Sequence, residues 1–504
     1  MTLILGVKYS LLGLEEDALI QIISFLEPPD ILRLAKTCNR FHEITALRIV
    51  WANACKFHVI NKGFPFPDTA LDSLSTQNLV YHATNGWRLA QRWIRGLSTP
   101  LRTRYISGMS GTSISDVRFV PGHGRRFILT ISKSVWSAMA IWDMGEEGGE
   151  DARKVCEWSP RGAIFNGFAL NSDSNSEATV AVSLQLNEQM FVKILHLRSH
   201  PGCGYDFEEM YSVDTPMKPV TLVRDLLVLS DDISQTAIWN WRIGSYAILQ
   251  HTNDSPTMLQ SNDCIQVLFA YRSVLVIRAR SIHLFPFPAL VVHNADEPPP
   301  PPHPPIAHHS FCWVDGECVT VCPFLDQSTP PHSSPPWHPL SILVRGESDD
   351  PWSSDIHNIE LYTLHPNPLF LSSEEQHEAC VPPYLFPPRL HYQIPCLRGS
   401  LSCKKIILGR FGTAMWIQPR DRFVGGLLAD IPAHLVPSSN MQETLVVAVF
   451  PGSLKPGPSE GHVIVGKKLI GNDSMNSWTS FDYDEVRGRV VLGSNFGRVT
   501  VLDL

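Results

Sequence analysis

The stretch LEEDALIQIISFLEPPDILRLAKTCNRFHEITALRIVW, residues 14–51, decides the fold of the N-terminal part of the chain. Its apolar residues recur at i, i+3, i+4 and i+7, which places them on one face of a helix. In the first predicted helix these residues are Leu19, Ile22, Ile23 and Leu26. Pro28 and Pro29 are expected to end that helix, and Asp30 to cap a second one. The second helix carries Ile31, Leu34, Ala35 and Cys38, and a third is indicated by Phe41, Ile44 and Leu47. Spacing alone predicts a small helical subdomain.

The identities of these residues resemble those of an F-box. F-box sequences typically begin Leu-Pro-x-Glu, continue through a Ser-aromatic-Leu step and a Pro-Asp-Leu corner, and end in a Cys-Arg-x-Phe/Trp segment and Leu-Trp. The matching residues here are Leu14, Asp17, Leu19, Ile22, Ile23, Ser24-Phe25-Leu26, Pro29-Asp30-Ile31, Cys38-Asn39-Arg40-Phe41 and Trp51. Glu15 stands where the family usually has Pro, and an acidic residue also suits the first turn of a helix.

This resemblance implies a partner for the helices. A helical unit of roughly 40 residues buries only a small core, so part of its apolar surface is available to another protein. By resemblance that protein is a Skp-type adaptor, which links F-box proteins to a cullin scaffold and a RING subunit. The chain would then be the substrate-recognition subunit of a ubiquitin ligase, with catalysis supplied by the complex. The residues expected to bind the adaptor are Leu14, Leu19, Ile22, Ile23, Phe25, Leu26, Pro29, Ile31, Leu32, Leu34, Cys38 and Phe41.

Composition limits the classes of protein to consider. The chain has 504 residues, 44% of them hydrophobic, which predicts more than one globular domain. Its formal net charge is −8, so no basic field favours nucleic acid. The opening MTLILGVK is too short for a signal peptide and no run of 18 apolar residues occurs, so we expect an intracellular protein, cytoplasmic or nuclear, without a membrane partner. Eleven irregularly spaced cysteines predict reduced thiols.

We expect three parts along the chain: an F-box at residues 10–55, a helical linker at 56–96 and a β-propeller at 97–504. The linker contains FPFPDTALDSLS (residues 64–75), which resembles the segment after the F-box in a large group of fungal F-box proteins. A helix follows, with an apolar face formed by Leu79, Ala83, Trp87, Ala90 and Ile94. Its other face carries Arg88, Arg92 and Arg95, which we interpret as a solvated surface.

From about residue 100 the sequence consists of short β-rich runs with turn residues between them. Seven paired runs repeat, several at intervals of roughly 45 to 55 residues, as propeller blades do. They are 127–130 with 140–143, 180–183 with 192–195, 226–230 with 237–240, 275–277 with 282–285, 342–344 with 359–362, 406–409 with 414–417, and 490–494 with 499–504. Only Trp142-Asp143 reproduces the WD dipeptide. The predicted fold class is therefore α+β multidomain, with an all-β, WD-repeat-like propeller of seven blades; a β-sandwich is the alternative.

Two further features concern strand order and loops. If residues 499–504 form the third strand of the last blade, its fourth strand must come from elsewhere, and Leu97–Ile106 is the expected donor. Proline cannot donate to a β-ladder, so EPPPPPHPP (297–305) and PFLDQSTPPHSSPPWHP (323–339) predict a loop insertion at 296–339. Such runs are either plain exposed loops or ligands of SH3 or WW domains. The interval 419–477 also has room for a loop insertion.

The sequence offers no catalytic or cofactor signature: Walker A, Gly-x-Ser-x-Gly and His-Glu-x-x-His motifs are absent. The best metal candidates are His303, His308, His309, Cys312, Cys318 and Cys322. Their spacing matches no structural zinc pattern, and Asp315-Gly316 reads as a hairpin turn between two strands. We therefore expect no metal, cofactor or catalytic residue. Arginines that could read phosphate on a target protein are Arg224, Arg242, Arg272, Arg278, Arg280, Arg410 and Arg420. The rivals to a ligase receptor are an interaction scaffold and a propeller hydrolase.

Overall fold

The structure is a computed structural model that describes residues 11–107, 112–122, 126–145, 152–200, 204–231, 235–250, 263–292, 299–311, 320–323, 338–346, 356–370, 381–397, 401–420, 442–450, 454, 466–472 and 476–504. The chain divides into two compact units. Unit 1 is Met1–Ser98 with Val449–His462 and Asp484–Gly488; unit 2 is Thr99–Ala448, Val463–Tyr483 and Arg489–Leu504. No helix in the described ranges is both long and apolar enough to cross a membrane.

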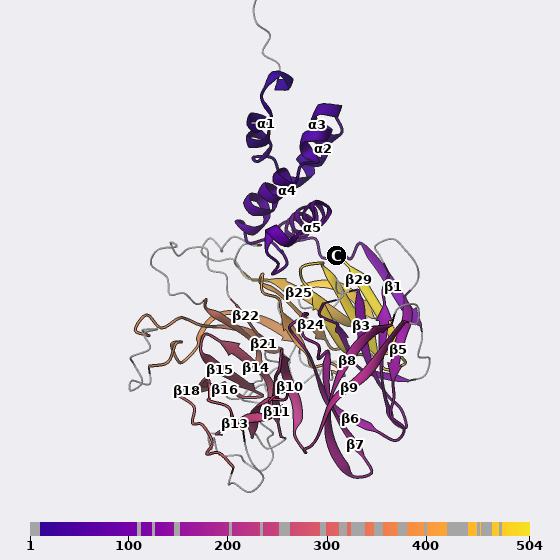
Figure 1. Ribbon diagram of the computed structural model, residues 1–504, viewed down its shortest axis with the longest axis vertical. Coiled ribbons are helices and arrows are strands. Elements are labelled where there is room, and N and C mark those ends of the chain that lie inside the picture. The colour runs from indigo at the N-terminus through magenta and orange to yellow at the C-terminus, as the bar shows by residue number, and fades with distance from the viewer. Residues whose placement is uncertain are drawn as a thin grey trace, which may run out of the picture. The chain divides into compact units, whose positions relative to one another are not determined.

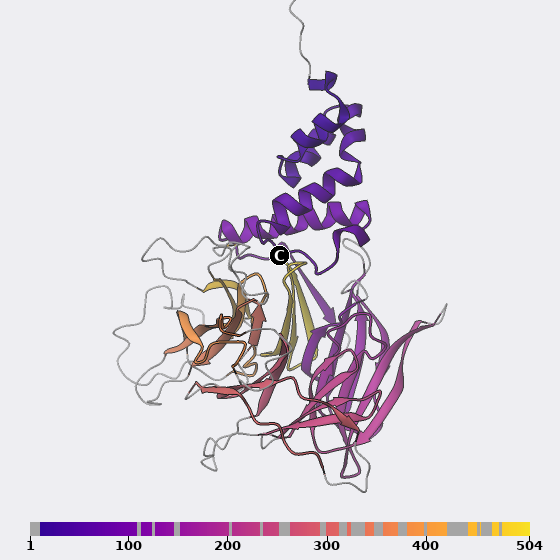
Figure 2. The same cartoon turned by 60° about the vertical axis from the view of Figure 1, so that its left-hand side comes forward.

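The N-terminal segment of unit 1 is helical and is drawn from indigo to purple in Figure 2. In chain order its helices are η1 (Leu11–Gly13), α1 (Glu16–Ile23), α2 (Pro28–Ala35), α3 (Asn39–Thr45), α4 (Arg48–Cys55), the π-helical turn η2 (Lys56–Ile60), η3 (Leu71–Ser73) and α5 (Thr76–Ile94). The predicted helices are present, but their ends differ from the prediction.

The start of α2 corrects the sequence interpretation. Pro28 and Pro29 form the first turn of α2, and Glu27 is the N-cap. Proline suits this position because the first N–H groups of a helix have no acceptor within it and the fixed φ of proline is already helical. Asp30 is therefore not a cap; it lies inside the first turn and pairs with Arg33 at 2.7 Å. The predicted third helix is also split, since α3 ends at Thr45 and α4 follows.

The core of the helical unit comes from the predicted apolar positions. Leu19, Ile23, Ile31, Phe41 and Ile44 are each at most 7% exposed. Trp51 is also buried, and its indole Nε1 donates a hydrogen bond to the carbonyl oxygen of Thr45 at 2.7 Å. This bond satisfies a buried donor and ties α4 to the end of α3.

The linker helix α5 buries a face that differs partly from the prediction. Its buried residues are Leu79, Ala83, Asn85, Gly86, Leu89, Ala90 and Trp93. Ile94, which was predicted on this face, is 43% exposed because the helix ends there. At Gly86 a Cβ atom would lie 2.4 Å from the carbonyl oxygen of Pro65. Glycine thus allows the segment after η2 to approach α5 closely.

Unit 2 is a β-propeller whose described strands form seven sheets (Figure 1). Blade 1 is β2 (Ser113–Phe119), β3 (Phe127–Lys133), β4 (Ser137–Asp143) and β5 (Arg153–Trp158). Blade 2 is β6 (Ile164–Leu170), β7 (Val180–Leu186), β8 (Gln189–His200) and β9 (Gly204–Asp214). Blade 3 is β10 (Lys218–Val223), β11 (Leu226–Ser230), β12 (Thr236–Asn240) and β13 (Ser245–Leu249), with β17 (Val291–Val292) as a fifth strand.

The remaining blades follow the same antiparallel order. Blade 4 is β14 (Cys264–Ala270), β15 (Ser273–Arg278), β16 (Ser281–Pro286) and β18 (Ala307–Ser310). Blade 5 is β19 (Thr320–Pro323), β20 (Leu340–Gly346), β21 (Ile356–Leu364) and β22 (Arg389–Leu397). Blade 6 is β23 (Ile406–Leu408), β24 (Thr413–Gln418), β25 (Glu443–Val449) and β26 (Lys467–Asn472). Blade 7 is β27 (Trp478–Asp484), β28 (Arg489–Ser494), β29 (Arg498–Asp503) and β1 (Arg102–Ser107).

The prediction of seven blades is confirmed, with one shift. Six of the seven predicted pairs are the second and third strands of their blades. The sixth pair, around residues 406 and 414, instead forms the first and second strands of blade 6. Its third and fourth strands, β25 and β26, lie inside the interval 419–477, where the sequence predicts room for a loop insertion.

The predicted closure of the ring is confirmed. β1 pairs antiparallel with β29 in the register Arg102↔Asp503 to Ser107↔Arg498, and the two strands lie side by side in Figure 1. Ile106, Val499 and Val501 are buried in a core cluster that also contains Ile114 and Val117 of blade 1. The last and first blades therefore share apolar packing as well as one donated strand.

The sequence predicts a loop insertion at 296–339, but the structure places strands within this Pro-rich span. β18 completes blade 4 inside it, and β19 begins blade 5. Asp315-Gly316, which the sequence predicts as a hairpin turn, lie outside the described residues. The described part of the first Pro-rich run, residues 299–305, has no regular secondary structure apart from an isolated bridge at His303.

The closed ring makes a stability prediction at β29. Val501 is 0% exposed, so Val501→Asp places an unpaired charge in the core shared by blades 7 and 1. We expect it to lower the free energy of unfolding of the propeller by about 3 kcal/mol or more. Thermal or denaturant unfolding measures the effect. The control is Phe496→Asp, in the turn before β29, where the side chain is 61% exposed. Equal stability of the two variants would contradict the closed ring.

Gly86 provides a second stability prediction, for the helical unit. Gly86→Ala forces the Pro65 carbonyl away from α5, and overpacking of this kind costs about 1–3 kcal/mol. Chemical unfolding followed by helix circular dichroism measures the loss. Gly13→Ala is the control, because no atom lies within 4 Å of its added Cβ. Unfolding of both variants at the same denaturant concentration would contradict the close approach of the Pro65 carbonyl to Gly86.

Candidate functional site

The helical unit exposes a set of apolar side chains around α1 and α2. Phe25, just after α1, is 74% exposed, and Ile22 on α1 is 41% exposed. Leu14 and Leu32 are each 38% exposed. Large apolar residues at this exposure lose contact with water when a partner covers them, so they are candidates for an interface. We refer to Leu14, Ile22, Phe25 and Leu32 as the exposed apolar set.

The structure divides the twelve residues predicted to bind an adaptor. Those of the exposed apolar set are available to a partner. Leu26, Pro29, Leu34 and Cys38 are partly exposed. Leu19, Ile23, Ile31 and Phe41 are buried in the core of the helical unit. The side chains of these last four already pack between the helices, so their direct contact with an adaptor stays a prediction that their burial does not favour.

The backbone around the exposed apolar set is fixed by polar contacts. The Arg40 guanidinium donates to the carbonyl oxygen of Leu14 at 2.6 Å, across 26 residues of sequence. His58 Nε2 lies 2.8 Å from the carbonyl oxygen of Ser24, which immediately precedes Phe25.

Burial raises the pKa of the Cys55 thiol in α4 to about 12. That cysteine is therefore a neutral core residue at physiological pH.

The propeller contains a cavity of about 800 Å³ that is lined mainly by the first strands of its blades. Charged side chains of both signs line it: Asp116, Arg118, Lys218, Asp231, Asp263, Lys404, Lys405 and Asp482. None of the seven arginines that the sequence suggested for phosphate recognition is among the described residues of this lining. Arg224 instead pairs with Asp173, and Arg242 with Glu177.

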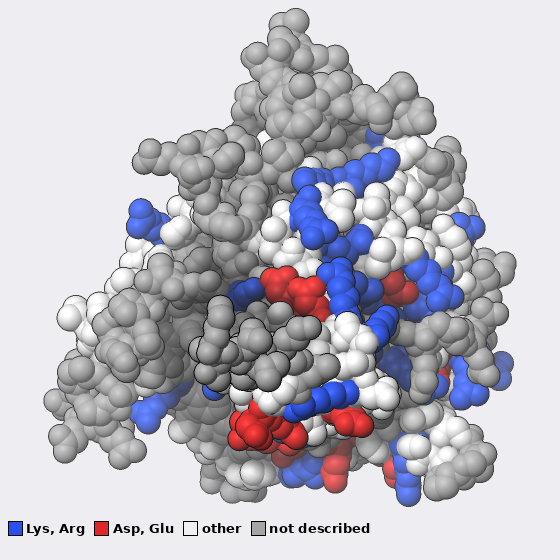
Figure 3. Space-filling view, turned by 90° about the horizontal axis from the view of Figure 1, so that it is seen from above, with Lys and Arg blue, Asp and Glu red and all other residues white. Residues whose placement is uncertain are grey.

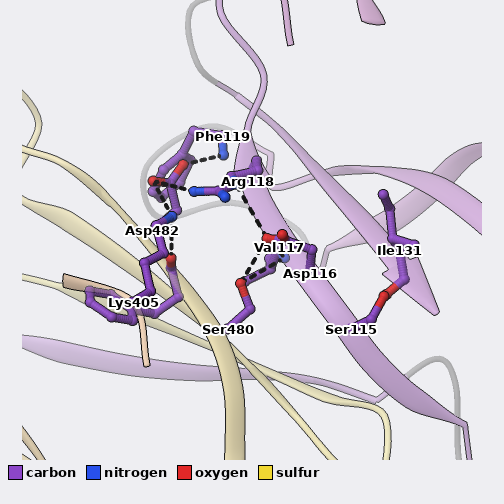
Figure 4. Close-up of polar contacts among 10 residues, drawn as sticks. Ser115, Asp116, Val117, Arg118, Phe119, Ile131, Lys405, Ser480 and Asp482 are labelled. Carbon is purple, nitrogen blue, oxygen red and sulfur yellow. Dashed lines mark hydrogen bonds and ion pairs between the residues drawn. The ribbon is translucent and has the colours of Figure 1, made fainter. Parts of the chain in front are cut away.

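A polar network in this cavity joins blade 1 to blade 7 (Figure 4). Ser480 Oγ donates to Asp116 Oδ1 at 2.7 Å, and the backbone N–H of Phe119 donates to Asp482 Oδ2 at 2.9 Å. Arg118 Nε lies 3.2 Å from Asp116 Oδ1, and Lys405 Nζ lies 3.6 Å from Asp482 Oδ1. The Ser480–Asp116 and Phe119–Asp482 bonds connect β2 with β27 and so support the same closure as the β1–β29 pair, whereas the Arg118–Asp116 pair lies within β2 and Lys405 precedes β23 of blade 6.

The protonation states of Arg118 and of two cysteines that line the cavity depend on their burial and on the charges beside them. Burial alone would lower the pKa of Arg118, but the carboxylates of Asp116 and Asp482 outweigh it and raise that pKa. Burial raises the pKa of the lining Cys403 thiol to about 12 and that of Cys264 to about 11. Both thiols stay protonated at neutral pH, which argues against either one as a nucleophile.

The candidate metal ligands are only partly described. Cys312 and Cys318 lie outside the described residues. His308 and His309 belong to β18, and the His303 main chain is bonded to β13. Within the described ranges no group of three or more His, Cys, Asp or Glu side chains is placed to hold a metal.

Surface charge is mixed. Figure 3 shows Lys and Arg side chains gathered over the middle of one face, with groups of Asp and Glu among them. On the described surface of that face, positive and negative side chains are therefore interspersed.

Residues 16–56 match the family model described as F-box-like, and α1 to α4 lie within that match. The chain is similar in structure to the β-propeller domain of Cps50 (Swd1) from Myceliophteria thermophila, at 10% identity and a TM-score of 0.42 over 81% of this chain and 99% of that one. It is also similar to a chain of a mitotic checkpoint complex, at 8% identity and a TM-score of 0.43 over 81% of this chain and 95% of that one. No curated protein matches the sequence. The F-box resemblance is confirmed, and the chain carries an F-box-like domain and a seven-bladed propeller.

The network between blades 1 and 7 makes a third stability prediction. Asp482→Ala leaves Lys405 and Arg118 with one fewer counter-charge and removes the acceptor for Phe119, so we expect a loss of about 1–3 kcal/mol. Denaturant unfolding of the full chain measures it. Glu208→Ala breaks the Arg198–Glu208 pair, which is about half exposed on both sides. That control should cost less than about 1 kcal/mol. Equal losses would argue against a role for the network in closure.

Proposed function

We propose that this protein is the substrate-recognition subunit of an F-box-type cullin-RING ubiquitin ligase. The F-box-like domain at residues 16–56 carries the proposal, because it combines a family match with an exposed apolar set on a small helical unit. In the proposal this set binds a Skp-type adaptor, and through it a cullin and a RING subunit. The propeller binds a target protein, and the chain itself is not catalytic.

The mechanism is proximity. The adaptor holds one part of the chain and the propeller holds a target, which raises the effective concentration of target lysines near a ubiquitin carrier. This requires one part of the chain for the adaptor and another for the target, and the F-box-like match at residues 16–56 and the seven-bladed propeller supply two such parts. No group on this chain needs to form or break a bond.

The adaptor contact is proposed for the exposed apolar set together with the partly exposed Leu26, Pro29, Leu34 and Cys38. Phe25 and Ile22 expose the largest apolar fractions among them. Partly buried aromatic and aliphatic side chains that become fully covered usually dominate the energy of an interface. Leu19, by contrast, would test the fold of the helices and not the contact, since it is 1% exposed.

The test uses Ile22→Glu and Phe25→Glu in the full chain. A charge forced into an apolar interface costs several kcal/mol, so we expect adaptor affinity to fall by about 100-fold or more. Calorimetry or pull-down with a purified Skp-type adaptor measures it, and circular dichroism checks that the helices remain folded. Ile94→Glu is the matched control, because Ile94 is 43% exposed at the end of α5 and outside the proposed contact.

Two outcomes would change the proposal. If the folded variant carrying both Ile22→Glu and Phe25→Glu bound the adaptor with wild-type affinity, the exposed apolar set would not be the adaptor contact. Adaptor binding without cullin-dependent ubiquitination of any propeller-bound protein, in a reconstituted complex, would favour the interaction scaffold over the ligase receptor.

A further inference from the structure

The run Pro299–Pro305, PPPPHPP, has a backbone conformation set by its covalent chemistry. Each proline ring fixes φ near −65°, and a residue that precedes proline is restricted to extended conformations. Together these restrictions produce the polyproline II helix, which has three residues per turn and no internal hydrogen bonds. The run is therefore extended and lies outside the blade strands, apart from the isolated bridge of His303 to Leu249.

Main-chain hydrogen bonds hold this run along the edge of the propeller. His303 is the only residue in it with a backbone N–H, which donates to the carbonyl oxygen of Ile248 in β13 at 2.8 Å. The carbonyl oxygen of His303 accepts from the N–H of Gln250 at 2.7 Å. Immediately after the run, the N–H of Ile306 donates to the carbonyl oxygen of Leu284 in β16 at 2.8 Å. The run thus passes from the outer strand of blade 3 to blade 4.

The exposure of the residues follows the threefold period of polyproline II. Pro300, His303 and Ile306, three residues apart, are half-buried and form the edge facing the sheets. A second edge consists of Pro299, Pro302 and Pro305, of which only Pro305 is half-buried. The third edge consists of Pro301 and Pro304, both exposed. One edge anchors the helix, and two edges present prolines to solvent.

We propose that Pro299–Pro305 is a docking site for a protein module that reads polyproline II through an aromatic-lined groove. Such grooves accept ligands with prolines at i and i+3, which Pro299/Pro302 and Pro301/Pro304 provide. A groove needs two edges of the ligand helix, and two edges are free here. The site lies outside the F-box-like domain, so it goes beyond the proposed function by adding a partner that the adaptor does not supply.

Anchoring and charge shape this interaction. Because the run is held by His303 before any partner arrives, little conformational entropy is lost on docking. Residues 299–305 contain no Lys, Arg, Asp or Glu, so the contact depends on proline rings and free backbone carbonyls. The affinity should therefore change little when the salt concentration is raised. A module that requires a basic residue beside the prolines fits this site poorly.

The same prolines also shield the edge of β13 from pairing with other strands, because proline cannot donate to a ladder. If edge protection is the only role of the run, its prolines need only lack backbone N–H donors, and no aromatic groove is expected to bind them. The two roles are separated by measuring binding and stability in the same variants.

The experiment titrates the full chain, without adaptor, against three purified and fluorescently labelled probes: a WW domain, an SH3 domain and an EVH1 domain. We expect at least one probe to bind. The variants Pro299→Ala/Pro302→Ala and Pro301→Ala/Pro304→Ala should each weaken that binding by about tenfold or more, equivalent to about 1.4 kcal/mol. The control is Pro286→Ala, an exposed proline at the end of β16 and outside the proposed site, which should bind as wild type does. Thermal melts check that all three variants are folded.

Several results would overturn the proposal: no binding by any probe, binding that survives both double variants, or equal weakening by the control. Melting of the double variants below the wild-type temperature, with no probe binding to the wild type, would leave edge protection as the role of the run. The chain carrying Ile22→Glu and Phe25→Glu should bind the probe normally. Failure of the adaptor contact and failure of this site are therefore distinguishable.

Discussion

The pairing of β1 with β29 is the constraint on which the propeller depends. It joins residues almost 400 positions apart in the chain, and the seventh sheet is incomplete without it. The pair is reinforced on both sides of the strand. Val501 and Ile106 pack with blade 1, and Asp503 accepts from Arg489 at 2.7 Å and from Arg104 at 3.3 Å. Because blades 7 and 1 share an apolar core, as blades 1 and 2 do, a gap between blades 7 and 1 would expose both of its faces at once.

The second and third strands of the blades could be predicted from sequence because they are buried on both faces. β15 and β20, for example, are apolar for most of their length and buried almost throughout. First and fourth strands are shorter or half-exposed, as in β5 and β18, and carry too weak a pattern. In blade 6 a long connection separates β24 from β25, so the pattern matched the first two strands instead. The sequence did not reveal β18 and β19, because the Pro-rich runs beside them dominate the composition of residues 296–339.

The F-box-like domain could be recognised from residue identities, but its surface could not be read from spacing. A helix in a unit this small has apolar residues on more than one side, and periodicity does not distinguish core from interface. Ile22 and Ile23 are adjacent and equally apolar, yet one is 41% exposed and the other 1%. The difference arises from how α1 packs on α3 and α4, which the linear sequence does not specify. The N-cap at Glu27 was missed because Asp30 is a better capping residue in isolation.

The bonds that close the ring also limit where the propeller can recognise a partner. Arg118 and Lys405 line the central cavity, but both are engaged by carboxylates that hold β2 beside β27. A ligand that competed for Asp116 or Asp482 would weaken the closure, so binding in the cavity has to add to these bonds and leave them intact. The exposed prolines of Pro299–Pro305 are not used in this way, because the main-chain hydrogen bonds of the run are made by His303 and the half-buried edge faces the sheets. A partner can cover them without breaking any bond that the fold requires, which makes the outer edge of blade 3 a less costly place to bind than the center of the ring.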